Sequence, residues 1–198
     1  NGNLYVESSN GMESNNGGDI VTLGTYENFE LEIDFKITKG ANSGIKYFVD
    51  TSLNKGLGSA IGLEYQILDD KSHPDGSQKF KVLEFRDGQW VDFKEGVKKN
   101  RGVSSLYDLI EPDKIQWKRV VPNTWPRAKI VSNNGHIEHW LDNVMVLQYN
   151  RFSQVFKSLV EYSKYSVWDN FGQAKSGHIL LQDHGDKVLF KNIKIKEF

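Results

Sequence analysis

The amino-acid sequence predicts an all-β fold in which two antiparallel sheets pack as a sandwich, with one short helix. Short stretches of alternating apolar and polar residues recur along the chain, as expected where one face of each strand is buried. Most gaps between these stretches hold Gly, Asn, Asp or Pro, which favour turns. The chain also has 5 Trp, 8 Tyr and 11 Phe beside 18 Gly. Aromatic residues suit the pleated, half-buried surface of a sheet, so composition and pattern agree.

The predicted strands follow one another with turn residues between them. Sequences such as KGANSG, DDKSHPDGSQ and SNNG separate the alternating runs. These runs cover residues 29–37, 44–50, 61–68, 80–85, 127–131, 136–141, 144–149, 179–181 and 188–198.

Residues 153–164 (SQVFKSLVEYSK) are the exception to this pattern. Val155, Phe156, Leu159 and Val160 recur at the spacing of one apolar helix face. Ser153 is placed to cap the helix N-terminus. We expect this helix to pack at an edge or end of the sandwich as structural cover.

Length and charge limit the remaining possibilities. A chain of 198 residues without an internal repeat predicts one domain over residues 1–198. Its 25 basic and 26 acidic residues leave a formal net charge of -1, which gives no basic surface for nucleic acid. No apolar run is long enough for a membrane span. The absence of cysteine excludes thiolate chemistry, and the sequence has no phosphate-binding loop, serine-hydrolase elbow or zinc-protease motif.

Strand parity separates a polar face from the core. Residues two apart in a strand share a face, and in segments 44–50, 61–68 and 179–184 one set of positions is apolar. If that set faces the core, the opposite face of the predicted strands collects amides, charges and aromatic rings: Lys46, Phe48, Glu64, Gln66, Trp140, Gln182 and His184. Such groups suit a sugar-binding groove, which needs hydrogen-bonding partners for hydroxyls and flat apolar surfaces. The alternative is a solvated outer sheet.

Two loops are candidates for the walls of this groove. The first, LDDKSHPDG, contains Asp69 and His73, and the second, SSLYDLIEP, contains Tyr107. Turn chemistry and apolar anchoring explain the same residues without a site. A histidine among carboxylates is also compatible with a divalent cation, although the sequence requires no cofactor.

One carboxylate spacing invites comparison with glycosidases. Glu64, Gln66 and Asp69 stand at i, i+2 and i+5, which partly resembles the Glu-x-Asp-x-x-Glu strand of retaining glucanases. Gln66 replaces the middle acid, so a conventional carboxylate pair is not favoured.

Several longer blocks of the sequence carry a more specific resemblance. In order, they are GGDIVTLGTYENFELEIDFKITKGANSGIKYFV, GLEYQILDDKSHPDG, SLYDLI, NGHIEHWLDNVMVLQYN and FGQAKSGHILLQDHGDKVLFKNIKIK. Together they resemble the 3-keto-disaccharide hydrolase family. The resemblance implies a concanavalin A-like jelly-roll sandwich, a carbohydrate substrate, and a bacterial protein exported to the periplasm or the exterior.

The resemblance also implies a mechanism and roles for the candidate residues. A ketone at C3 of the sugar acidifies the hydrogen at C2, so a base can start an elimination that expels the glycosidic oxygen, after which water adds. Glu64 or His184 is then the base, and Lys46 with Gln182 or Gln66 stabilises the enolate. The acid, or a ligand of a metal ion, is then Asp69, His73 or His139. The sugar site is shaped by Phe48, Tyr107 and Trp140.

Two rival functions stay open at this point. A non-catalytic carbohydrate-binding module would use the same sandwich, and a conventional retaining glycosidase would need Asp69. In the segment 182–186, Asp183 is expected to cap the turn at Gly185, while Gln182 and His184 face the groove.

Overall fold

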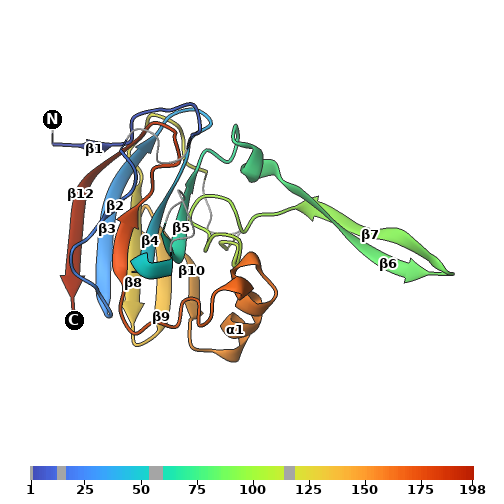
Figure 1. Ribbon diagram of the computed structural model, residues 1–198. Coiled ribbons are helices and arrows are strands. Elements are labelled where there is room, and N and C mark those ends of the chain that lie inside the picture. The colour runs from blue at the N-terminus through green and yellow to red at the C-terminus, as the bar shows by residue number, and fades with distance from the viewer. Residues whose placement is uncertain (1, 13–16, 54–59, 114–118) are drawn as a thin grey trace.

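The computed structural model describes residues 2–12, 17–53, 60–113 and 119–198. Two antiparallel sheets pack face to face, and a hairpin projects from the sandwich (Figure 1). The six-stranded sheet has the order β1 (Leu4–Tyr5), β12 (Val188–Glu197), β3 (Phe29–Ile37), β8 (Arg127–Asn133), β9 (His136–Leu141) and β10 (Val144–Asn150). The four-stranded sheet has the order β2 (Ile20–Val21), β11 (His178–Leu181), β4 (Asn42–Asp50) and β5 (Ile61–Leu68).

The core lies between the two sheets, as the alternating pattern predicts. Every second residue of β3 and β5 is buried there, because side chains in a strand point alternately to its two faces. The largest fully buried apolar side chains include Phe29, Phe35, Tyr47, Leu63, Tyr65 and Phe190. The prediction of a two-sheet antiparallel sandwich is therefore confirmed.

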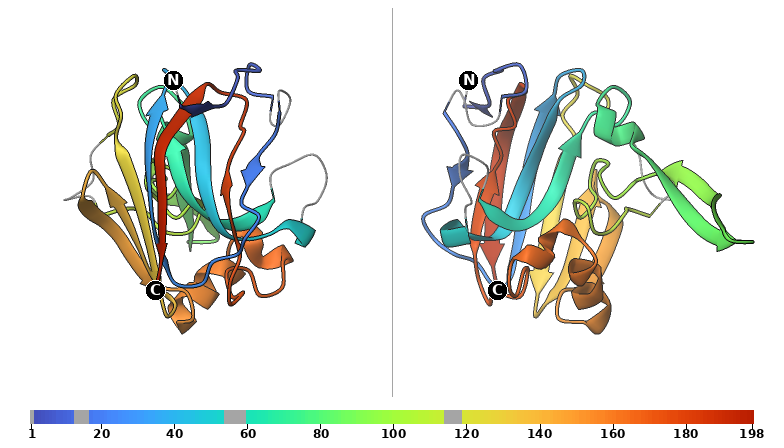
Figure 2. Two further views of the ribbon diagram at one scale, coloured as in Figure 1. Left: turned by 90° about the vertical axis from the view of Figure 1, so that its left-hand side faces the viewer. Right: turned by 45° about the vertical axis from the view of Figure 1, so that its right-hand side comes forward.

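The projecting hairpin consists of β6 (Lys79–Arg86) and β7 (Gln89–Val97) and points away from the sandwich, as the right-hand view of Figure 2 shows. The alternating pattern predicts a strand over residues 80–85 but does not predict β7. The turn between the strands is Asp87-Gly88, and both residues have positive φ. Asp-Gly is a sequence signal for a tight hairpin, so β7 could have been recognised from this dipeptide.

The predicted helix forms at one end of the sandwich as α1 (Gln154–Glu161) (Figure 1). Ser153 caps it, since its hydroxyl accepts a hydrogen bond from the Phe156 amide at 3.2 Å. The Phe156 ring is buried and stacks on Tyr149, with ring centroids 5.4 Å apart. Val155 and Leu159, by contrast, are 73% and 36% exposed, so the prediction that they share a buried face with Phe156 is wrong.

The described part of the chain also has three short 3-10 helices between its longer elements, namely η1 (Thr51–Leu53), η2 (Pro74–Ser77) and η3 (Lys164–Val167). Within the described residues, no helix has both the length and the apolar character needed to cross a membrane.

Candidate active site on the four-stranded sheet

A cavity of about 250 Å³ lies on the face of the four-stranded sheet that points away from the core. Strands β4 and β5 and the residues after β11 form its floor, while the loop around Tyr107 and η3 form its walls. The residues that line it are Asn42, Lys46, Ile61, Gly62, Glu64, Gln66, Tyr107, Lys164, Tyr165, Trp168, Gln182 and His184.

A row of polar side chains crosses the floor from β5 toward β11. The Asn42 side-chain nitrogen lies 3.3 Å from His184 Nε2, and the Asn42 and Gln66 amides are hydrogen-bonded at 3.1 Å. The swapped orientation of the Gln66 amide replaces that bond: the Gln66 nitrogen then donates to Glu64 Oε1 and to the Ser43 carbonyl, each at 3.1 Å, and the Gln66 oxygen faces Asn42 as the acceptor. Two amides therefore connect the carboxylate of Glu64 to the imidazole of His184.

Gly44 gives Glu64 the space it occupies. In the register of β4 with β5, Lys46 pairs with Glu64 and Gly44 with Gln66. The Glu64 side chain leans across β4 above Gly44, and a Cβ at position 44 would collide with its carboxylate. The glycine thus lets a long side chain lie flat on the sheet and reach the cavity.

Lys46 and Gln182 place a cation and an amide beside this row. The buried Lys46 ammonium donates to the Ala60 carbonyl at 3.2 Å, which fixes the end of a flexible side chain. Gln182 is held by its backbone, whose amide donates to the Gly44 carbonyl at 3.0 Å. Its buried side-chain oxygen has no hydrogen-bond partner among the described residues. That oxygen is therefore suited to accept a hydrogen bond from a ligand.

The turn after β11 has the structure that the sequence predicts. Asp183 is buried, and its carboxylate accepts hydrogen bonds from the amides of Gly185 at 2.9 Å and Gly18 at 3.2 Å. Gly185 has a φ of 79°, and a Cβ there would meet the backbone of Gly11 and Met12. Parity and turn chemistry thus separate Gln182 and His184, which line the cavity, from a structural Asp183.

The loop that carries Tyr107 runs along the free edge of β5. Its backbone extends the sheet, because the Ser104 amide donates to the Gln66 carbonyl at 2.8 Å and the Tyr107 amide to the Glu64 carbonyl at 3.0 Å. This pairing sets Tyr107 beside Glu64 in the cavity wall. Burial in that wall raises the pKa of the Tyr107 hydroxyl, so the group stays protonated.

Lys164, the first residue of η3, also lines the cavity. Its ammonium lies 4.3 Å from the ring centroid of Tyr107 and 5.1 Å from that of Tyr165, as in cation–π contacts. The side chain is 47% exposed. Partial burial nevertheless lowers the pKa of Lys164, and this effect exceeds the opposing attraction of Asp108 and Glu64. A lysine with a lowered pKa is a better proton donor than a free one.

The structure brings together only part of the predicted site. Six predicted residues line the cavity, namely Lys46, Glu64, Gln66, Tyr107, Gln182 and His184. Five do not, namely Phe48, Asp69, His73, His139 and Trp140.

Phe48 and Trp140 depart from simple strand parity. The register of β4 shifts between Tyr47 and Asp50, and Phe48 has a φ of 51°. This bulge turns the Phe48 ring into the core instead of the groove. Trp140 belongs to β9 of the six-stranded sheet, where its indole donates to Glu138 at 2.7 Å. Its outward face therefore lies on the other side of the sandwich.

The remaining three residues support local structure. Asp69 is buried and accepts hydrogen bonds from the amides of Gly40 at 2.8 Å and Lys71 at 3.2 Å. Burial acts to raise the pKa of Asp69, but these hydrogen bonds outweigh it and lower the value. His73 caps η2 by accepting from the Asp75 amide. His139 is completely buried between the sheets, where it contacts Tyr47 and Ser104.

Within the described ranges, no three His, Cys, Asp or Glu side chains lie together as a cluster that could bind a metal ion.

Sequence reasoning also missed four residues that line the cavity, namely Asn42, Lys164, Tyr165 and Trp168. Parity could have found Asn42, because it precedes Gly44 and Lys46 by two and four positions. The residues of η3 have no such signal, since only the tertiary fold brings them over the sheet.

Fold and site together define a jelly-roll β-sandwich with a polar and aromatic ligand cavity on one sheet, an architecture shared by lectin domains. The chain belongs to the family of 3-keto-alpha-glucoside-1,2-lyase-like domains, whose family model matches residues 1–196. The family resemblance seen in the sequence is thus confirmed.

Relatives with names or structures support this assignment. The chain is 32% identical to the 3-keto-disaccharide hydrolase of Bacteroides thetaiotaomicron over 215 residues, which cover 98% of this chain and 68% of the relative. A candidate glycosyl hydrolase from Parabacteroides distasonis has a TM-score of 0.74 at 26% identity, covering 99% of this chain and 81% of that one. A second one from that organism, at 23% identity, shares the fold with a TM-score of 0.65 and covers 98% and 90%.

Proposed function

We propose that this protein hydrolyses glycosidic bonds of sugars that carry a ketone at C3, by elimination across C1 and C2 followed by addition of water. Family membership supports the coarse activity, hydrolysis of a glycosidic bond. The 3-keto substrate and the route through elimination are the finer proposal: the substrate follows the names of the family and of its relative, and the route is supported by the composition of the cavity.

The observation that carries the proposal is the number of carboxylates. Among the described residues that line the cavity, Glu64 is the only carboxylate. A conventional glycosidase uses two, separated by about 5–5.5 Å in retaining enzymes and about 6.5–9.5 Å in inverting ones. Asp69, the second acid of that hypothesis, lies outside the cavity and binds backbone amides. One carboxylate suits a reaction that needs one base and no carboxylate nucleophile.

In the first step, Glu64 removes the proton from C2. The electron pair of the C2–H bond forms a C2–C3 double bond, and the negative charge moves to the C3 oxygen. Lys46 and Gln182 line the same cavity as Glu64, so their ammonium and side-chain amide can stabilise this enolate oxygen.

In the second step, the enolate returns to a ketone and a C1–C2 double bond forms as the C1–oxygen bond breaks. The leaving oxygen needs a proton, and its donor in this proposal is Lys164, which lines the cavity. The product is an enone together with the free alcohol. Glu64 is now protonated and Lys164 is neutral, so both are ready for the reverse chemistry with water.

Hydration follows the same path backward. Neutral Lys164 takes a proton from water as its oxygen bonds to C1, and Glu64, whose carboxyl proton has exchanged with solvent, delivers a proton to C2. The sum is hydrolysis, and both residues recover their starting states. If water did not add in the cavity, the enzyme would be a lyase, which is the activity named in the family description.

Product analysis in D₂O tests this function. Wild-type protein is incubated with a 3-keto-glucoside and with the matched unoxidised glucoside. We expect cleavage of the oxidised substrate alone, with one deuterium at C2 of the sugar product. A control incubation of unlabelled product with the protein corrects for later exchange. Cleavage without deuterium at C2 would contradict the elimination, and binding without any product would indicate a carbohydrate-binding module.

The choice of base is tested by substitution. His184 stands at the other end of the hydrogen-bonded row and is the alternative base. If Glu64 is the base, C2 deuteration stops in Glu64→Gln and continues in His184→Ala. The reverse result would assign the base to His184.

A further inference from the structure

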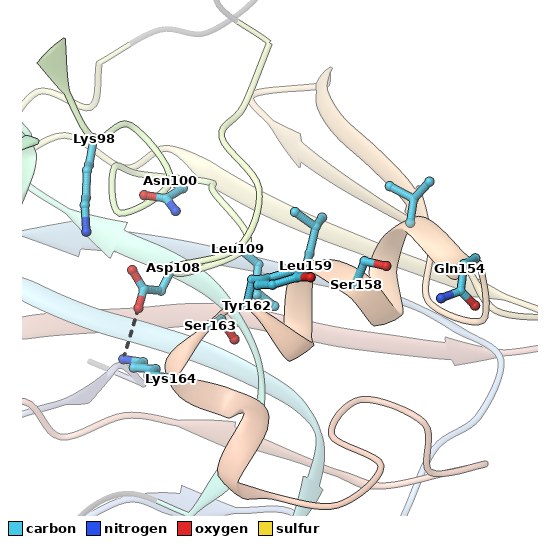
Figure 3. Close-up of a pocket in the computed structure, with 11 residues that line it drawn as sticks. Lys98, Asn100, Asp108, Leu109, Gln154, Ser158, Leu159, Tyr162, Ser163 and Lys164 are labelled. Atoms are coloured by element: carbon cyan, nitrogen blue, oxygen red, sulfur yellow. Dashed lines mark ion pairs between the residues drawn. The ribbon is translucent and has the colours of Figure 1, made fainter. Parts of the chain in front are cut away.

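A second hollow adjoins the candidate active site on the far side of Lys164. Its volume is about 690 Å³, against about 250 Å³ for the cavity on the sheet. Figure 3 shows α1 and the residues after it on one side and the segment from Lys98 to Leu109 on the other. We call this hollow the helix groove; it is lined by Lys98, Asn100, Asp108, Leu109, Gln154, Val155, Ser158, Leu159, Tyr162, Ser163 and Lys164.

Two short pieces of chain form the boundary between the hollows. Tyr107 lines the cavity, whereas the next residue, Asp108, lines the groove. Likewise Ser163 lines the groove and Tyr165 lines the cavity, while Lys164 between them lines both. A molecule longer than one sugar ring that enters the cavity on this side therefore passes Lys164 into the groove.

Contacts between charged side chains hold the residues at the boundary between the two hollows. Asp108 forms an ion pair with Arg101 at 2.8 Å and lies 4.0 Å from the Lys164 ammonium, the contact marked in Figure 3. Arg101 also packs over the Tyr107 ring, with 5.5 Å between the guanidinium carbon and the ring centroid. These contacts fix Lys164 where the bond between two sugar rings would cross.

The groove exposes apolar surface that the fold itself does not use. Val155, Leu159 and Tyr162 follow one side of α1 at spacings of four and three residues. Val155 is 73% exposed and Tyr162 is 88% exposed, while the core-facing side of the helix is occupied by Phe156. An exposed apolar stripe on a helix that already has a buried face is typical of a surface that binds a partner or a ligand.

Polar groups accompany the apolar stripe on both walls. The hydroxyl of Ser158 and the amides of Gln154 and Asn100 line the same groove as the Tyr162 ring. A pyranose ring has an apolar C–H face and an edge of hydroxyls, so this mixture fits a sugar better than a purely apolar group.

The volumes of the two hollows also favour a sugar ring in the helix groove. Pockets that hold a drug-sized ligand measure about 300–1,000 Å³. The sheet cavity lies below this range and suits one ring, whereas the groove lies within it. A glycoside with two rings would fill both hollows, with its leaving group in the larger one.

We infer that the helix groove is the leaving-group subsite and binds the second sugar ring of a 3-keto-disaccharide, with Tyr162 as its stacking surface. This inference rests on the proposed function. It makes Tyr162 a specificity-determining residue that touches the leaving group only.

Two substrates of different length test the inference. Wild type and Tyr162→Ala are assayed with a 3-keto-disaccharide and with methyl 3-keto-glucoside, whose leaving group is too small to reach the groove. We expect the ratio of kcat/KM for disaccharide over methyl glycoside to fall about three- to tenfold in Tyr162→Ala, through KM, because one aromatic contact is lost. Tyr162→Phe keeps the ring and should keep the wild-type ratio.

A matched control separates this effect from general damage. Tyr5 is an exposed tyrosine on β1, which lies at the far edge of the other sheet (Figure 1), and Tyr5→Ala should leave the ratio unchanged. An unchanged ratio in Tyr162→Ala, or an equal loss with Tyr162→Phe, would overturn the inference while the proposed function stands. If wild type cleaved neither oxidised substrate, the proposed function would fail and the inference with it.

Discussion

Two polar clusters lie on opposite sides of the four-stranded sheet, and each contains a histidine. The inner cluster lies in the core, where His139 Nε2 and the hydroxyls of Tyr47 and Tyr149 are connected at 2.8 Å each. The outer cluster is the row from Glu64 to His184 on the cavity floor. Both rows use side chains of β4, yet only the outer one meets a cavity.

The two clusters differ in whether all of their hydrogen-bonding atoms have partners within the protein. His139 Nδ1 contacts the Ser104 carbonyl at 2.9 Å, so this nitrogen carries the proton and Nε2 accepts from Tyr47. Both ring nitrogens are thus occupied, and burial lowers the pKa of His139 to about 4. Beside the outer cluster, the buried Gln182 oxygen has no partner among the described residues. Residue type alone therefore does not distinguish a site from a polar core; access and unused hydrogen-bonding capacity do.

The largest expected effect concerns the outer cluster. Glu64→Gln keeps the shape but removes the base, so kcat for a 3-keto-glucoside should fall about 10³-fold or more, within the usual range for a lost general base. Thermal unfolding should change little, since the amide can remain in the row. Glu138→Gln, on the other sheet, is the matched control and should retain activity. Comparable activity in both variants would show that the outer cluster does not contain the base.

The next effect concerns the inner cluster and appears in stability. Because the pKa of His139 is about 4 in the folded protein and the ordinary histidine pKa is 6.5, the unfolded chain binds the proton more readily between these values. The stabilisation is complete above pH 6.5 and decreases as pH falls toward 4. The free energy of unfolding should lose about 3 kcal/mol over this range, at about 1.4 kcal/mol per pKa unit.

Denaturant unfolding at several pH values measures this loss. His139→Gln should be less stable at pH 7 but should lack this part of the pH dependence, so the two curves converge in acid. Parallel curves would mean that His139 is not the responsible group. His136→Gln, which alters a more exposed histidine of the same strand, should keep the wild-type slope.

Gly44→Ala tests whether the backbone of β4 positions the outer cluster. The three atoms nearest to the new Cβ all belong to the flexible side chain of Glu64, so the fold should persist while the carboxylate moves. We expect kcat/KM to fall about 10- to 100-fold, as displacement of a reacting group by about an ångström does. Gly24→Ala adds a Cβ whose nearest neighbour is 4.0 Å away and serves as the control. Equal kcat/KM values for the two variants would contradict the role given to Gly44.

The smallest effect concerns Lys164, which joins the outer cluster to the helix groove. Lys164→Met should lower kcat about tenfold for substrates with poor leaving groups and much less for nitrophenyl glycosides, which leave without a proton. In wild type the alkaline fall of kcat should begin below the ordinary lysine pKa of 10.5, since partial burial lowers the pKa of Lys164 and only the protonated amine donates. An equal loss for both leaving groups would exclude the acid role.

Much of the fold follows from local pattern. The bounds of β3, β5 and β9 agree with the alternating segments, because a half-buried strand requires an apolar residue at every second position. Parity also placed Lys46, Glu64 and Gln66 on one face. It failed at Phe48, where a bulge adds a residue, and at Trp140, since periodicity does not say to which sheet a strand belongs.

The sequence by itself determined most of the strands, the capped helix, the turn at Gly185 and a polar set on one strand face, because each depends on residues a few positions apart. The tertiary structure alone decided which polar residues meet. Loop 104–108 pairs with the edge of β5, and η3 brings Lys164 and Tyr165 over the sheet, through contacts between residues distant in sequence. It also set His139 in the core and Glu64 at the cavity, since access to a ligand is a property of packed layers and has no signature in a single strand.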